Sequence, residues 1–362
     1  MKYGSVPALN EYIAMKAMFN YFGQEFELPV PLNESMLKFG EAHSPEYACF
    51  PFKLYLGYLR QLAEKGVTNI FVHGLCDIRS CRYVDLWEGT AQILRENGYP
   101  DFRINYWGGY GLDLSFDQLK EVMGGPSKFK MLRGILIFCL TLEAADKIND
   151  LANRSRPREK NNGETDAWLA KWNSELCGVK KFWQPRKIFR AALKEWENIP
   201  LDKEKKLIKV AFVGDMFKVH EPFSHFDTIR KLNRLGAEVR QSLQFSLIFF
   251  GMNKVPLKSD YQKRYAELMV KGKKYLQSSP ASFLDLSVGE VLEELENGAS
   301  GIVHFQSFGC MPDLLLKPIL DRIAKDYGVP IIHFLRDTHS SDTQYQTRLE
   351  AFVDLLKRKQ KI

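Results

Sequence analysis

The sequence of 362 residues lacks a hydrophobic run long enough to cross a membrane. Its longest apolar stretches, residues 134–142 and 243–252, fall well short of the ~20 residues that a spanning helix needs. The first residues also lack the apolar core of a secretory signal. We therefore expect a cytoplasmic protein, in which the six cysteines are thiols or metal ligands rather than disulfides.

Two common motifs are missing as well. No stretch has the G-x-x-x-x-G-K-[ST] pattern of a phosphate-binding loop, so any ATP hydrolysis should belong to a partner. No Cys-x-x-Cys pair is present, which disfavours a structural zinc site. Zinc held by three cysteines with His73 stays open as an alternative.

Charge is unevenly distributed. The net charge is +7, and the positive excess is concentrated in residues 154–160, 180–190 and 203–209. Such a segment can bind nucleic acid, but the aromatic residues near it fall at helical spacings typical of packing. We favour a solvated face or linker, and note that a cationic surface also attracts phosphate-bearing substrates.

Strand-like and helix-like segments alternate in both halves of the chain, which predicts an α/β fold with parallel sheets. The pattern becomes helical in the middle, where residues 128–153 are expected to form one long helix. We predict a first α/β lobe over 1–114, a helical insert over 115–206 and a second α/β lobe over 207–362. Within the second lobe, residues 222–235 are expected to form a single helix.

Three cysteines are predicted to lie in loops at helix starts. Cys310 follows the apolar strand 302–305 and precedes a helix opened by Met-Pro-Asp. Cys49 precedes an amphipathic helix, and Cys81 lies between a strand and a helix. A thiol at the amino end of a helix has a lowered pKa, so we expect Cys310 to favour the thiolate. Free cysteines are also among the most buried residues, so packing is the alternative for each.

Five stretches occur in an order that resembles a known family. They are Cys49-Phe-Pro-Phe-Lys-Leu-Tyr-Leu-Gly57, Cys81-Arg82-Tyr83 with residues 92–99, Val213-Gly214-Asp215 with residues 221–223 and 235–238, Phe308-Gly309-Cys310-Met311-Pro312, and residues 348–356. Together they resemble the 2-hydroxyacyl-CoA dehydratase superfamily, including its "CoA protein activase" relatives. The resemblance covers most of the chain except residues 115–206.

The resemblance implies two flavodoxin- or Rossmann-like lobes around an iron–sulfur cluster held by Cys49, Cys81 and Cys310. The expected cofactor is a 4Fe–4S cluster, with a double-cubane cluster as the variant. The resemblance also implies an ATP-dependent activator protein as electron donor, for reductive or radical chemistry on a CoA-linked or other small substrate. Chains of this superfamily pair, which predicts a homodimer or a paralogous partner subunit.

The sequence departs from the family at the second motif, where relatives carry Cys-Gly-Pro-Cys-Arg. Here four residues separate Cys76 from Cys81, so Cys76 is a further candidate ligand and not an assigned one. A fourth iron would be bound by Cys76 or left open, and an open iron can bind a substrate oxygen. Arg82 could tune the cluster potential or form a surface ion pair.

Other polar residues have weaker assignments. Asp215 follows a strand, and we interpret it as a helix cap or as an acid close to the site. His339 lies in a loop, where we expect it either to transfer protons or to cap the loop. His304 is expected to be a core histidine. Cys139 and Cys177 are interpreted as packing residues.

Two functions rival the catalytic one. The chain could be a non-catalytic electron-transfer or cluster-carrying subunit, in which case four protein ligands would hold the cluster. It could instead be a basic nucleic-acid-binding protein with buried structural cysteines, whose binding would weaken steeply with salt.

Overall fold

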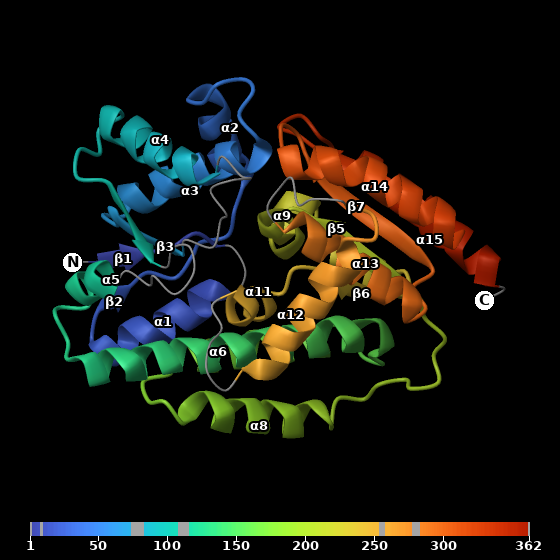
Figure 1. Cartoon of the computed structure of the whole chain (residues 1–362), viewed down its shortest axis with the longest axis horizontal. Helices are drawn as coiled ribbons and strands as arrows, with labels where there is room; N and C mark the ends of the chain where they lie inside the picture. Colours follow the sequence, from blue (N-terminus) through green and yellow to red (C-terminus); the bar gives the residue numbers. More distant parts are fainter. Residues whose placement is uncertain are drawn as a thin grey trace.

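The fold was analysed on a computed structural model, which describes residues 2–7, 10–73, 83–107, 116–252, 258–276 and 283–360. Two four-stranded, all-parallel sheets form two lobes, and a helical segment lies between them in the chain (Figure 1). The predicted α/β class is therefore confirmed, whereas the three domain limits stay a prediction.

The first lobe has the strand order β2-β1-β3-β4. Its apolar strands are buried because helices cover them, as parallel sheets require. The strands are β1 (Lys2–Gly4), β2 (Glu25–Phe26), β3 (Asn69–His73) and β4 (Arg103–Trp107). The helices are α1 (Glu11–Phe22), α2 (Glu34–Ala42), α3 (Phe50–Glu64) and α4 (Tyr83–Glu96).

Two glycines allow the backbones of helices α2 and α3 to come into direct contact. A Cβ atom at Gly40 would lie 1.6 Å from the Lys53 carbonyl oxygen, and one at Gly57 would lie 1.8 Å from the Met36 carbonyl oxygen. Any side chain at either position would collide with backbone. This close packing fixes the start of α3, which directly follows Cys49.

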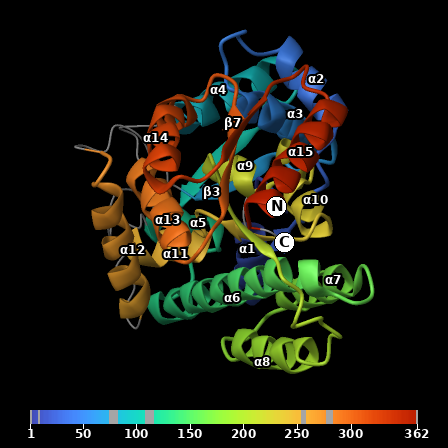
Figure 2. The ribbon, with the colours of Figure 1, turned by 90° about the vertical axis from the view of Figure 1, so that its right-hand side faces the viewer.

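The helical segment consists of α5 (Phe116–Val122), α6 (Lys128–Ser155), α7 (Glu164–Cys177) and α8 (Gln184–Trp196). Helix α6 confirms the long helix predicted from the sequence. It runs beneath both lobes, and α8 lies on its far side in both views (Figures 1 and 2). No helix among the described residues is both long and apolar enough to span a bilayer.

Asp146 on α6 joins the two lobes. One carboxylate oxygen accepts a hydrogen bond from Asn10 Nδ2 at 2.7 Å, and the other accepts one from the Ser246 backbone N–H at 2.7 Å. Asn10 precedes α1 in the first lobe, and Ser246 lies in the second. The Asp146 carboxylate and Ser246 are buried and Asn10 is half-buried, so these hydrogen bonds satisfy groups that have little or no contact with water.

Some of the positive charge in the middle of the chain is neutralised by ion pairs. Arg156 Nε lies 2.9 Å from Asp166 Oδ1, and Arg158 Nη2 lies 3.2 Å from Glu238 Oε2. These two arginines therefore have structural partners. The interpretation of the remaining basic residues as a solvated face or linker stays a prediction.

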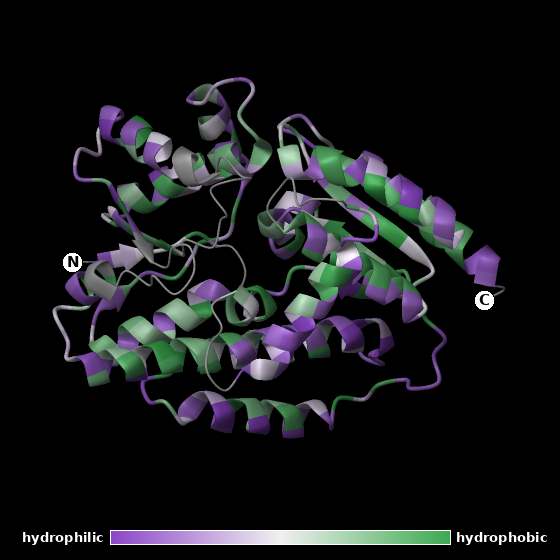
Figure 3. Ribbon diagram, viewed as in Figure 1, coloured by the Kyte–Doolittle hydropathy of each residue, from purple (hydrophilic) through white to green (hydrophobic). Residues whose placement is uncertain are grey.

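The second lobe repeats the strand order of the first as β6-β5-β7-β8. Its strands are β5 (Ile208–Gly214), β6 (Ala237–Gln241), β7 (Gly301–Ser307) and β8 (Ile331–Arg336). Its helices are α9 (Met216–His220), α10 (Thr228–Arg234), α11 (Phe245–Met252), α12 (Ser259–Gly272), α13 (Leu284–Glu296), α14 (Met311–Tyr327) and α15 (Asp342–Gln360). Helix α15 ends in a hydrophilic turn, coloured purple in Figure 3.

The prediction of one helix over residues 222–235 is wrong. Pro222–His225 forms a short 3₁₀ turn, and α10 begins only at Thr228. Phe226 and Asp227 between them both have a φ of 52°, which is outside the helical region. The periodicity of the apolar residues did not reveal this break.

Candidate functional site

The candidate site lies at the carboxyl ends of β5 and β7, the two central strands of the second sheet. The chain leaves β5 toward β6 on one side, and β7 lies on the other side. Ligands of open parallel sheets bind in the crevice where the strand order reverses in this way. A cavity of about 60 Å³ occurs there, and both Cys49 and Cys310 line it.

Cys49 comes from the first lobe. It is the N-cap residue of α3, with an extended backbone, and its side chain is half-buried. The next residue, Phe50, donates its backbone N–H to the Phe308 carbonyl oxygen at 3.1 Å. This hydrogen bond links the Cys49 motif to the Cys310 motif across the two lobes.

Gly309 allows the two motifs to approach. Its φ is +74°, and a Cβ atom there would lie 3.1 Å from Cys49 Cα and 3.3 Å from the Tyr47 carbonyl oxygen. A side chain at this position would be strained by its own backbone and crowded by the first lobe. The glycine of the Phe-Gly-Cys sequence is thus required by the contact between the lobes.

Cys310 is the N-cap residue of α14, as the sequence predicted. The expected lowering of its pKa is wrong. Burial raises the pKa of the Cys310 thiol well above its usual value, and the negative charges of Asp313 and Asp215 add to the rise. The side chain is only 9% exposed, so the helix terminus does not offset the loss of water.

The Asp215 carboxylate caps α9, which confirms the helix-cap interpretation. Its Oδ1 accepts the backbone N–H groups of Phe217 and Lys218, each at 3.0 Å, and its Oδ2 accepts the Ser307 hydroxyl at 2.5 Å. Burial, followed by the charge of Asp313, raises the pKa of Asp215 to about 6.

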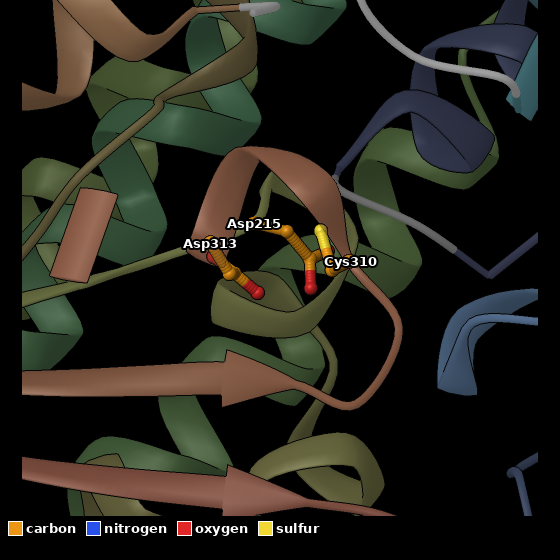
Figure 4. Close-up of side chains that lie close together, drawn as sticks. All are labelled: Asp215, Cys310 and Asp313. Atoms are coloured by element: carbon orange, nitrogen blue, oxygen red, sulfur yellow. The ribbon is translucent and has the colours of Figure 1, made fainter. Parts of the chain in front are cut away.

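The Asp313 carboxylate fixes the end of β7. Its Oδ2 accepts the Ser307 backbone N–H at 2.8 Å, and its Oδ1 lies 3.8 Å from His304 Nε2. One ligand atom each from Asp215, Cys310 and Asp313 lies within 4.8 Å of the other two, and Figure 4 shows these side chains converging. Both oxygens of Asp215 and the Oδ2 of Asp313 already accept hydrogen bonds from protein donors.

Lys218 is a buried cation beside the site. Its ammonium donates to the Gln306 carbonyl oxygen at 2.8 Å and lies over the rings of Phe50 and Phe305, at 5.0 and 5.6 Å. Burial lowers the pKa of Lys218 to about 8, and the charge of Asp215 limits the fall.

Arg336 is a second buried cation under the Cys49 motif. Its guanidinium lies 3.8 Å from the centroid of the Phe226 ring and 5.1 Å from that of Phe50. Its Nη1 donates to the Ser340 carbonyl oxygen at 2.9 Å, and its Nη2 lies 3.6 Å from Glu34 Oε1. The sequence analysis missed both cations, although the position of Arg336 at the end of an apolar strand was a signal.

The structure separates His339 from the cysteines. Its side chain is 83% exposed and lies 3.4 Å from Glu41 Oε1, and it lines a different surface groove. Cys76, Cys81 and Arg82 lie outside the described residues, as does the side chain of His73. Their assignments stay predictions.

Cys139 and Cys177 take no part in this site. Cys139 is buried in a hydrophobic cluster, where burial raises the pKa of its thiol to about 12. Cys177 packs against a separate cluster of helices, and burial raises the pKa of its thiol to about 11. Both positions agree with the packing interpretation.

Residues 8–82 match the CoA enzyme activase uncharacterised domain. The matched segment contains Cys49, Cys76 and Cys81 but not Cys310, and it covers a minority of the chain. No curated protein matches this chain. The comparisons thus associate the first lobe with an activase-related domain and assign no reaction.

Proposed function

We propose that this chain is an iron–sulfur protein of the 2-hydroxyacyl-CoA dehydratase type, with a 4Fe–4S cluster between its lobes. Cys49 and Cys310 would bind the cluster together with Cys81. The observation that carries the proposal is that two cysteines far apart in sequence line one small cavity, each at the amino end of a helix.

The residues present fit such a group. Iron–sulfur clusters are held by thiolates, and the two described thiols come from facing helix termini, whose N–H groups favour anionic sulfur. Burial and two carboxylates oppose the free thiolate of Cys310, so a bound metal would displace its proton. Lys218 and Arg336 supply positive charge on the inner side.

When bound, the cluster would supply one-electron reductive or radical chemistry, with an ATP-dependent activator as the electron donor. The chain's own residues hold and insulate it. The Phe50–Phe308 backbone hydrogen bond keeps the two cysteine motifs together. Asp215 and Asp313 brace the turn between β7 and α14. The substrate would be CoA-linked or another small molecule.

One observation favours the second candidate, a cluster-carrying electron-transfer subunit. Among the described residues, the cavity beside the two cysteines measures only about 60 Å³, so no separate space for an acyl group adjoins the thiols. On this alternative the substrate would bind to another subunit, and four protein thiolates would leave no open iron.

Anaerobic purification, reconstitution with iron and sulfide, and quantitation of both elements test the proposal. We expect a brown protein with about four irons per chain and a paramagnetic signal after reduction. A change in that signal on adding an acyl-CoA would favour catalysis, and an unchanged signal would favour electron transfer. A colourless protein that stays free of iron would refute both.

A further inference from the structure

A cationic cavity, separate from the candidate site, lies where the helical segment meets the second lobe. Its volume of about 440 Å³ falls within the range of small-molecule pockets. Its wall comes from the 3₁₀ turn Arg156–Arg158, the start of α7, the chain before β5, and helix α10. Among the described residues, it shares no lining residue with the cavity of the two cysteines.

Two of the basic segments of the sequence, residues 154–160 and 203–209, meet at this cavity. The charged residues that line it are the cations Arg156, Lys205, Arg230 and Arg234 and the carboxylates Glu159 and Asp166. Even when Asp227, which pairs with Arg230 at 3.3 Å, is counted as well, four cations face three carboxylates. The cavity therefore carries an excess of positive charge.

One of the three carboxylates serves a helix rather than the cations. Glu159 Oε1 accepts the Gly163 backbone N–H at 2.9 Å, and its Oε2 accepts the Thr165 backbone N–H at 3.0 Å. Both donors lie at the start of α7, so the partial positive charge of the helix terminus offsets the charge of Glu159. Only Asp166 and Asp227 remain, among the carboxylates named, to balance the four cations.

Arg156 is the most deeply buried of the four cations, at 9% exposed. Its Nη1 donates to Asn153 Oδ1 at 2.8 Å and to Asn233 Oδ1 at 3.2 Å, which fixes the guanidinium in the cavity wall. Its Nε shares Asp166 Oδ1 with Arg230 Nε, at 2.9 and 3.2 Å, so one carboxylate oxygen serves two guanidinium groups. Burial lowers the pKa of Arg156 and the charge of Asp166 opposes this, while the charge of Arg230 lowers it further. Because a guanidinium stays charged, a further negative charge would be favourable here.

Arg234 and Lys205 are exposed where they line the cavity, and neither forms an ion pair among the described residues. Their charges can therefore meet a ligand that enters from solvent. We propose that this cavity binds a small molecule through an oxyanion, a phosphate or carboxylate group, held by Arg156, Arg230 and Arg234. Guanidinium groups suit both oxyanions, because their N–H donors match two oxygens at once. Such a ligand would join the helical segment to the second lobe, whether or not the protein carries a cluster.

Isothermal titration calorimetry on the full chain tests the proposal with two probes, pyrophosphate and citrate, at one fixed ionic strength. We expect saturable one-to-one binding of at least one probe. Arg234→Gln and Lys205→Gln should each weaken it roughly fivefold or more, because each removes a charged donor from the cavity. Arg186→Gln is the matched control, since it removes the same charge from an exposed arginine of α8 that does not line the cavity.

The two probes separate the sources of the oxyanion. Tighter binding of pyrophosphate would support the site and assign it a phosphorylated ligand, and tighter binding of citrate would support it and assign a polycarboxylate. No saturable binding of either probe would overturn the proposal. An equal loss of affinity in Arg186→Gln and Arg234→Gln would also overturn it, because the anion would then follow the overall positive charge. All three variants change exposed side chains and the titration needs no iron, so its result is independent of the proposed cluster.

Discussion

At the residue scale, the site combines sulfur, carboxylate and buried cations within a few side chains. The sequence analysis found Cys49, Cys310 and Asp215, because loops at strand ends and helix starts can be recognised locally. It missed Lys218, since nothing in the sequence indicates that this lysine turns inward toward the Gln306 carbonyl oxygen. It misjudged the pKa of Cys310 because the nearby carboxylates and the burial come from the tertiary structure.

Glu11, a buried carboxyl at the start of α1, should give stability a distinctive pH dependence. Burial raises its pKa from 4.5 to about 8. Between these pH values the unfolded chain releases a proton that the folded protein keeps. The free energy of unfolding should therefore fall as pH rises through this window, by at most ~1.4 kcal/mol per pH unit from this group.

Urea unfolding of wild type and Glu11→Gln at pH 5 and pH 8 checks this dependence. The variant should lose that part of the pH slope and gain stability relative to wild type at the higher pH. Glu64→Gln, at an exposed glutamate paired with Arg60, serves as the control and should keep the wild-type slope. Equal slopes in wild type and Glu11→Gln would show that Glu11 does not carry a shifted pKa.

At the element scale, the ends of helices could be predicted from the sequence where a capping residue marks them. Asn33, a residue type typical of helix N-caps, precedes α2, and its side chain accepts the backbone N–H groups of Ser35 and Met36. Asp215 was interpreted as a helix cap, but the extent of the five-residue α9 was not predicted, because so short a helix has no measurable periodicity. The break at Phe226 and Asp227 was missed because a positive φ is rare for phenylalanine and only occasional for aspartate.

The turn between β7 and α14 should be more sensitive to substitution than a turn of similar backbone conformation elsewhere. Gly309→Ala adds both left-handed strain and a contact with the Cys49 backbone, whereas Gly328→Ala adds only the strain, since its Cβ would meet open space. We expect Gly328→Ala to lower the free energy of unfolding by about 1 kcal/mol and Gly309→Ala by roughly 2–3 kcal/mol. Chemical unfolding measures both, and equal losses would argue against the close contact between the lobes.

At the scale of the whole molecule, the two lobes and helix α6 share one hydrophobic core. The largest hydrophobic cluster contains residues of both sheets, and the rings of Tyr55 and Phe217 meet across the lobes with centroids 5.7 Å apart. The sequence predicted two α/β lobes from alternation and order. It did not predict how they meet, because that depends on contacts such as the hydrogen bond between Phe50 and Phe308.

Replacement of Asp146 should destabilise the contact between the two lobes. Asp146→Ala leaves the buried Ser246 N–H and the half-buried Asn10 Nδ2 without their acceptor. We expect the free energy of unfolding to fall by about 1–3 kcal/mol, since that is the cost of one unsatisfied buried polar group and Asn10 can still bind water. Asp150→Ala, one turn further along α6, removes an exposed pair with Arg154 and should cost at most about 1 kcal/mol. Thermal unfolding of both variants compares them, and a similar small loss would mean that Asp146 does not join the lobes.

The most direct test of the central claim is the iron content of cysteine variants after identical anaerobic reconstitution. Cys49→Ala and Cys310→Ala each remove one thiol from the shared cavity, Cys81→Ala removes the third predicted ligand, and Cys177→Ala is a control outside the site. If one cluster joins the lobes, the first three variants lose the iron and the control keeps it. Full iron retained by either Cys49→Ala or Cys310→Ala, in a folded protein, would contradict a shared metal centre.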